Sequence, residues 1–218
     1  MKLSEKELQE MANIFKFKAL RGRYDVLEEY FDIEEGDTVF DCGSFYGDMS
    51  IYFSKKVGAT GQVYSFEPLG FNLKQLMIIL IKLNLTNVKP LRIALGDKKG
   101  KTKFYLSDYS NAGSILKEFR KVTDRYVDIN VDTVDNIVNK FKISKLDFLW
   151  ANIEGAEVKM LKGAENTLRN NDMKLMISTH RINDEYSTTD DVIKILESYN
   201  YKCSLVKNHP YWVYGEKK

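Results

Sequence analysis

The first residues suited to chemistry form the loop Asp41-Cys42-Gly43-Ser44-Phe45-Tyr46-Gly47, which follows a short apolar segment. Gly43 and Gly47 would let the backbone turn sharply and come close to a ligand. Amide groups at the start of the next helix would favour an anionic or carboxylate group. The four-residue glycine spacing differs from the dinucleotide pattern G-x-G-x-x-G. Alone, the loop fits either a nucleotide-type site or an ordinary strand-to-helix turn.

A second chemical group is Glu67, which comes 20 residues after Gly47, directly follows an apolar segment and precedes Pro68. A carboxylate offers two acceptor oxygens and can bind both hydroxyls of a ribose. The alternative is a solvated acid before a proline turn. Taken together, the loop and Glu67 indicate a ligand that contains adenosine.

Further polar residues follow later apolar segments, at Leu95-Gly96-Asp97, at Asn152-Ile153-Glu154-Gly155 and at His180. In open α/β sheets a ligand lies beyond the carboxyl ends of the strands, near the switch in strand order. These residues are therefore expected to meet the glycine loop and Glu67 at one edge of a sheet.

The elements that would position these residues alternate between strand and helix patterns. Strands are expected at 38–40, 62–66, 88–94, 146–153 and 175–178, and helices at 48–57, 70–84, 132–141, 156–170 and 189–199. Two strands at 101–106 and 126–131 enclose a polar loop, and 201–206 with 211–214 form a closing hairpin. This pattern predicts an α/β fold, a mostly parallel doubly wound sheet with an antiparallel C-terminal hairpin. We expect an N-terminal helical extension at 1–34 and one domain at 35–218.

Composition narrows the function classes. The chain has 218 residues, 44% of them hydrophobic, which is enough for one sizeable core. A net charge of +2 argues against a dedicated nucleic-acid binder. The longest purely apolar run, at 76–81, is too short to span a membrane, and the charged N-terminus lacks a secretory signal. We therefore expect a cytoplasmic protein.

The order and spacing of these blocks resemble the FkbM family of S-adenosylmethionine-dependent methyltransferases, over residues 37–181. The resemblance implies a Rossmann-like class I methyltransferase fold, S-adenosyl-L-methionine as cofactor, and transfer to a hydroxyl of a sugar or small natural-product-like acceptor. The blocks are Asp41-x-Gly43-x-x-x-Gly47, Phe66-Glu67-Pro68, Asn84, Ala94-Leu95-Gly96-Asp97, Asp147 to Glu157, and Leu161-x-Gly163-Ala164.

The resemblance also implies roles for single residues. The glycine loop would hold the methionine end of the cofactor, Glu67 the ribose, and residues 95–97 the adenine. Asn152 and Glu154 would lie near the sulfonium and the acceptor. The expected cofactor-binding residues are Asp41, Gly43, Ser44, Tyr46, Gly47, Glu67, Pro68, Leu95, Gly96, Asp97 and Asn152.

The chain departs from the family pattern at Trp150 and Asn152, where a lysine and an aspartate are usual. An asparagine cannot act as a general base, so the pattern leaves open a cofactor-binding protein with lost or altered catalysis. An RNA or protein acceptor is a further alternative. A nicotinamide-dependent oxidoreductase is disfavoured by the glycine spacing.

Methyl transfer is an in-line displacement, and a base assists when the acceptor is a hydroxyl. His180 follows a predicted strand, where the family often has a histidine, and is our candidate base or acceptor-positioning residue, with Glu154 and Asn152 as the other catalytic candidates. A loop histidine that caps a carbonyl is the structural alternative for His180. No His/Asp spacing calls for a metal. The N-terminal helices would cover the cofactor or form a homodimer contact.

Overall fold

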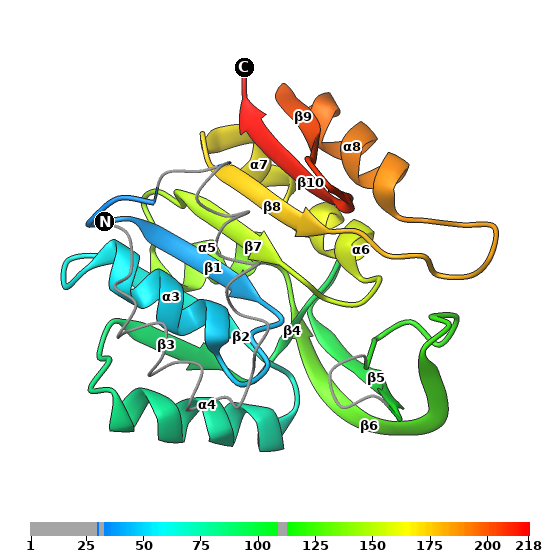
Figure 1. The fold of residues 1–218 in the computed structure, drawn as a ribbon, viewed down its shortest axis with the longest axis horizontal. Helices are drawn as coiled ribbons and strands as arrows, with labels where there is room; N and C mark the ends of the chain where they lie inside the picture. Colours follow the sequence, from blue (N-terminus) through cyan, green and yellow to red (C-terminus); the bar gives the residue numbers. More distant parts are fainter. Residues whose placement is uncertain (1–29, 31–32, 109–112) are drawn as a thin grey trace.

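A seven-stranded sheet forms the centre of the computed structural model, which describes Tyr30, residues 33–108 and residues 113–218. The order of the strands is β3-β2-β1-β7-β8-β10-β9 (Figure 1). They are β1 (Thr38–Cys42), β2 (Gln62–Phe66), β3 (Val88–Leu91), β7 (Phe148–Ala151), β8 (Lys174–Ser178), β9 (Tyr201–Val206) and β10 (His209–Lys217).

Helices cover both faces of this sheet. One core contains α3 (Asp48–Val57) and α4 (Gly70–Lys82). The other contains α5 (Val134–Phe141), α6 (Glu157–Lys162), α7 (Glu165–Asn170) and α8 (Thr189–Ser198). Because successive strand residues point to opposite faces, Val39 enters the first core and Phe40 the second. Burial on both faces explains why the central strands β1, β2, β7 and β8 are mostly apolar.

The order of the strands creates a crevice beside the glycine loop. β1 pairs in parallel with β2 and with β7, so the direction of winding reverses between β1 and β7. β10 pairs antiparallel with β8 and β9. The expected doubly wound sheet with a C-terminal antiparallel hairpin is confirmed, and its switch point lies where a ligand is expected.

The pair of strands expected at 101–106 and 126–131 is confirmed, but it belongs to a second sheet that was not predicted from the sequence. It has the order β4-β6-β5, from β4 (Ala94–Leu95), β5 (Gly100–Ser107) and β6 (Val122–Asp132). The single strand expected at 88–94 is therefore wrong. Leu91 pairs with the end of β2, whereas Ala94 pairs with Val131 of β6, so the chain changes sheets between them. Figure 1 shows β5 and β6 extending away from the main sheet.

The helix expected at 156–170 is also interrupted, because α6 ends at Lys162 and α7 begins at Glu165. A Cβ added to Gly163 would lie 2.0 Å from the carbonyl oxygen of Gly96, so this position allows the turn after β4 to approach. Almost all of the expected extension at 1–34 lies outside the described residues. Within the described ranges, no helix is long and apolar enough to cross a bilayer.

Candidate functional site

A pocket that opens to solvent lies at the carboxyl ends of β1, β2 and β7, and β4 and β5 contribute to its wall. Six of the predicted site residues line it. These are Gly43, Glu67, Pro68, Leu95, Asn152 and Glu154. The sequence-based site and the structural pocket therefore coincide at the switch point of the sheet.

Glu67 is 5% exposed and lies on the pocket wall directly after β2. Its Oε1 accepts hydrogen bonds from the Leu69 amide at 2.9 Å and the Asn72 side chain at 3.2 Å, and its Oε2 from the Phe45 amide at 3.0 Å. Burial raises the pKa of Glu67 to about 7, against the lowering effect of these donors. A carboxylate has about four acceptor positions, so Oε2 has room for a further donor from the pocket.

The glycine loop passes close to the end of β7. The Asn152 amide donates to the Cys42 carbonyl at 3.0 Å. Gly43 has a φ of +83°, and a Cβ there would lie 2.3 Å from the Asn152 carbonyl oxygen. Only glycine fits this contact, which lets the loop after β1 lie directly against the end of β7 where both line the pocket.

Asp41 does not line the pocket. It is fully buried within β1, where its Oδ2 accepts from the Ser50 hydroxyl at 2.5 Å, and that hydroxyl lies 2.6 Å from the Ser65 hydroxyl. Burial raises the pKa of Asp41 to about 7. Its contacts connect β1, α3 and β2 below the loop. Asp41 would therefore support the cofactor-binding loop from outside the pocket lining.

Other predicted cofactor residues also lie outside the pocket lining. Tyr46 stacks on Phe45, with ring centroids 3.8 Å apart. Gly47 begins α3 with a φ of +93°. The Ser44 hydroxyl is buried, and among the described residues it has no hydrogen-bond partner. Gly96 is buried and Asp97 is exposed in the turn after β4.

Glu154 is the predicted catalytic residue whose carboxylate is best placed for acid–base chemistry. It follows β7 in a turn with a φ of +51°, and Gly155 continues this turn with a φ of +99°. Glu154 lines the pocket, whereas His180 lies behind it, with Nε2 3.6 Å from Glu154 Oε2. The structure thus brings together the two predicted acid–base residues, with the carboxylate nearer the ligand space.

Two charged neighbours complete this group and were not predicted as site residues. Lys121 Nζ lies 3.7 Å from Glu154 Oε2, and Glu157 Oε1 lies 2.8 Å from His180 Nδ1. Burial raises the pKa of Glu154, and the charges of His180 and Lys121 oppose that shift. Burial lowers the pKa of His180, but its hydrogen bond to Glu157 and the charges of Glu157 and Glu154 outweigh burial and raise it overall.

Several apolar lining residues were likewise missed, and they come from segments with no ligand-binding pattern. Phe104 on β5 and Ile115 after it reach the pocket only because the small sheet folds against the main one. Within the described ranges, no group of three His, Cys, Asp or Glu residues is arranged to hold a metal ion.

Comparisons with known proteins agree with this geometry. The hexuronic acid methyltransferase AglP of Haloferax volcanii is 27% identical over 163 residues, which are 74% of this chain and 64% of that protein. The chain thus spans just under two thirds of the length of this curated relative.

Two solved structures share the fold. The methyltransferase FkbM from Methylobacillus flagellatus aligns with a TM-score of 0.59 at 21% identity, over 85% of this chain and 44% of that one. Fibrillarin from Aeropyrum pernix, solved with natively bound S-adenosyl-L-methionine, aligns with a TM-score of 0.51 at 14% identity, over 85% and 68%.

The fold is that of class I methyltransferases, as the family resemblance implied. The family model for the methyltransferase FkbM domain matches residues 41–203, three quarters of the chain. This chain therefore belongs to the FkbM methyltransferase family.

Proposed function

We propose that this protein binds S-adenosyl-L-methionine in the pocket and methylates a hydroxyl of a sugar or another small acceptor. The observation that carries this proposal is Glu67, a buried carboxylate that ends β2 on the pocket wall. The Phe45 and Leu69 amides orient it, and Oε2 retains an acceptor position for a ribose hydroxyl.

The rest of the pocket suits the same cofactor. Apolar side chains that include Leu95 and Phe104 would contact the adenine. The lining at Gly43 and Asn152 would hold the methionine portion, with the Asn152 amide group as a polar partner. Bound there, the cofactor supplies a methyl group whose bond to sulfur breaks as the bond to the acceptor oxygen forms, leaving the electron pair on sulfur.

Glu154 is the residue we assign to the acceptor proton. Glu154 lines the pocket beside Asn152, and a carboxylate within reach of a hydroxyl can accept its proton as the oxygen attacks. Asn152 would position the acceptor oxygen through a hydrogen bond. The activity named for the AglP relative supports an acceptor of the sugar class.

The departure at Trp150 does not affect this chemistry. Trp150 is 4% exposed, and its ring packs 4.4 Å from that of Trp212, in the core on the α3 side of the sheet. It is absent from the pocket lining, so this position supports the sheet rather than the ligand.

Calorimetric titration with S-adenosylhomocysteine tests the cofactor site. Wild-type protein and the Glu165→Ala control, changed at an exposed residue of α7, should bind it with equal affinity. Glu67→Ala should weaken binding at least tenfold, because it removes a charge-assisted hydrogen bond of about 1.5–3 kcal/mol. Equal binding by all three proteins would contradict the site.

Transfer of labelled methyl groups to a panel of neutral sugars, uronic acids and small phenols tests the activity. We expect label on a sugar hydroxyl and its loss in Glu154→Gln. Cofactor binding without transfer to any acceptor in the panel would instead favour a binding protein that has lost catalysis.

A further inference from the structure

Glu157 is a carboxylate buried deep beside the pocket and absent from its lining. It is 0% exposed at the start of α6. Its Oε1 accepts from the Gly155 amide at 2.9 Å and contacts His180 Nδ1 at 2.8 Å, while its Oε2 accepts from the Thr188 hydroxyl at 3.1 Å. A buried charge is costly unless it is paired and hydrogen-bonded. The contacts of Glu157 lead to the turn at Glu154–Gly155, to His180 and to Thr188, which is itself hydrogen-bonded to His180.

The contacts of His180 fix the direction of its ring. The Thr188 hydroxyl accepts the His180 amide at 2.9 Å, and the Thr188 amide donates to the His180 carbonyl at 3.0 Å. Phe119 packs edge-on against the imidazole, with ring centroids 5.9 Å apart. Because Glu157 accepts only from a protonated Nδ1, Nε2 is left to face Glu154.

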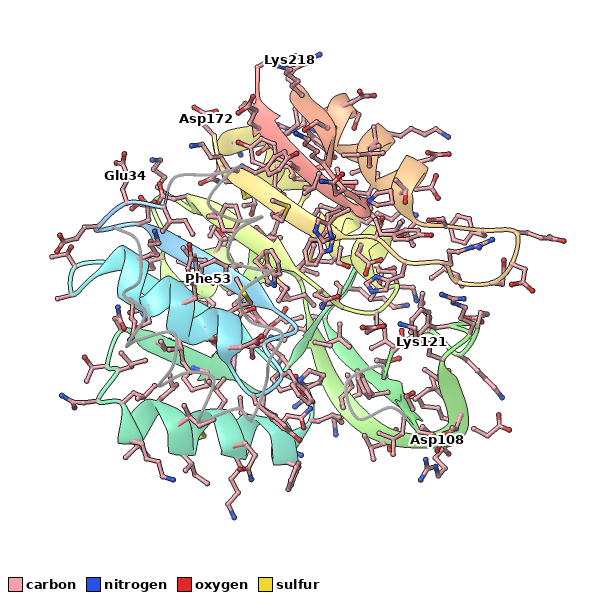
Figure 2. The ribbon with its side chains drawn as sticks, viewed as in Figure 1. Glu34, Phe53, Asp108, Lys121, Asp172 and Lys218 are labelled. Atoms are coloured by element: carbon pink, nitrogen blue, oxygen red, sulfur yellow. The ribbon has the colours of Figure 1, made fainter. Side chains whose placement is uncertain are left out.

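Charges alternate along this group as Lys121, Glu154, His180 and Glu157, from three different parts of the chain. Lys121 precedes β6 and, as labelled in Figure 2, lies on the side where β7 and β8 end. The nearby Tyr186 hydroxyl donates to Asp191 at 2.6 Å and so forms a pair of its own. Because His180 has a carboxylate beside each ring nitrogen, its protonated form makes the numbers of positive and negative charges in this buried group equal.

We propose that Glu157 is a positioning residue that holds His180 as an imidazolium, so that His180 keeps Glu154 ionised and directed into the pocket. This inference rests on the proposed function and deepens it. Glu154 then takes the acceptor proton, and His180, already protonated at both nitrogens, cannot serve as the base. His180 instead stabilises the charge that Glu154 carries before the transfer.

Nuclear magnetic resonance tests this assignment without an acceptor, because the chain has only two histidines, His180 and His209. A His209→Gln background leaves one imidazole to titrate. In it, Glu157→Gln should lower the midpoint of the His180 titration by about one pH unit or more, since an adjacent carboxylate shifts a pKa by 1–3 units. The matched control Glu165→Gln should leave the midpoint unchanged.

Glu154→Gln provides a second variant at the pocket surface, where the fold tolerates the change more readily than at buried Glu157. It should also lower the His180 midpoint, because it removes the carboxylate 3.6 Å from Nε2. Unchanged midpoints in the folded variants would overturn the proposal. This readout remains interpretable even if no acceptor is ever methylated.

The activity profile gives the second readout. In Glu157→Gln, His180 carries less positive charge and stabilises the ionised Glu154 less. The pKa of Glu154 should therefore rise, and the acidic limb of kcat against pH should move to higher pH while the KM for the cofactor stays unchanged. A uniform loss of kcat at every pH, with an unmoved limb, would indicate a structural role alone and refute the assignment.

Discussion

At the scale of single residues, the pocket depends on carboxylates that are difficult to ionise. Glu67 combines burial, which favours its neutral form, with three hydrogen bonds that favour its charge. The balance raises its pKa to about 7, so small changes in pH alter its charge near neutrality. A ribose hydroxyl donates a stronger hydrogen bond to the ionised form.

Affinity for S-adenosylhomocysteine should therefore rise as pH increases from 5.5 to 8.5, with the steepest change near pH 7, where Glu67 ionises. Glu67→Gln should bind at least tenfold more weakly at pH 8.5 and should show a much flatter pH dependence, because its amide does not titrate. Calorimetry at a series of pH values measures both effects.

Asp41 is the necessary control, because burial raises its pKa to about 7 as well. Asp41 lies outside the pocket lining, so Asp41→Asn should retain the rise in affinity with pH. If Asp41→Asn abolished that rise and Glu67→Gln kept it, the assignment of the ribose carboxylate would be wrong.

Site residues that belong to a local sequence pattern could be predicted, whereas those that reach the site through long-range contacts could not. Glu67 and Gly43 follow strands directly, so their position at the pocket could be predicted. His180 was expected at the ligand but lies behind Glu154. Lys121 belongs to a polar segment between two strands, and only the folding of the small sheet brings it to Glu154.

At the scale of elements, the close approach of backbones decides where helices end. Gly163 separates α6 from α7, and its carbonyl accepts the Asp135 amide at 3.0 Å, at the start of α5. The sequence predicted one continuous helix here because the apolar pattern continues across Gly163. The apolar pattern contains no information about the turn after β4, which packs against Gly163.

Gly163→Ala tests whether the close approach of the turn after β4 requires glycine at this position. The new Cβ would meet the Gly96 carbonyl oxygen at 2.0 Å, and a backbone atom cannot move aside as easily as a flexible side chain. Overpacking of this kind costs about 1–3 kcal/mol, which for a domain of this size lowers the Tm by roughly 2–4 °C per kcal/mol.

Gly100→Ala is the matched control, because no atom lies within 4 Å of the Cβ it would add. Its Tm should stay close to that of the wild type. Differential scanning calorimetry compares the three proteins, and equal melting of both variants would show that the contact between Gly163 and Gly96 is unimportant.

At the scale of the whole molecule, the centre of the main sheet was predictable because β1, β2, β7 and β8 are almost wholly buried and alternate with helices. The strands β5 and β6 were predicted as a pair, but the separate small sheet was not, because β4 has two residues and pairs with a strand far along the chain. Its absence from the prediction is also why Phe104 and Ile115 were missed at the pocket. Local periodicity indicates elements, whereas sheet membership depends on pairing between distant segments.

The same architecture buries ionisable groups at both ends of the strands, and the pKa shifts of the carboxyls and of His180 share one direction. Burial raises the pKa of four carboxyls, namely Asp37, Asp41, Glu67 and Glu154. The pKa of His180 is raised as well, through Glu157 and Glu154 and against burial. In each case the folded state keeps a proton at pH values where the unfolded chain has released it.

The free energy of unfolding should therefore fall as pH rises, because the folded state binds more protons than the unfolded state. The loss of stability that the carboxyls cause begins as pH rises above their unfolded pKa of about 4, and it is complete near pH 7 for Asp41 and Glu67. The stabilisation from His180 is fully present below its unfolded pKa of about 6.5, and it is lost as pH rises from there through the raised pKa of the folded state. Urea denaturation should thus give lower stability at pH 8 than at pH 5.5, and the double variant Asp41→Asn/Glu67→Gln should reduce that difference. Stability that rises over this range in the wild type would contradict the burial of these groups.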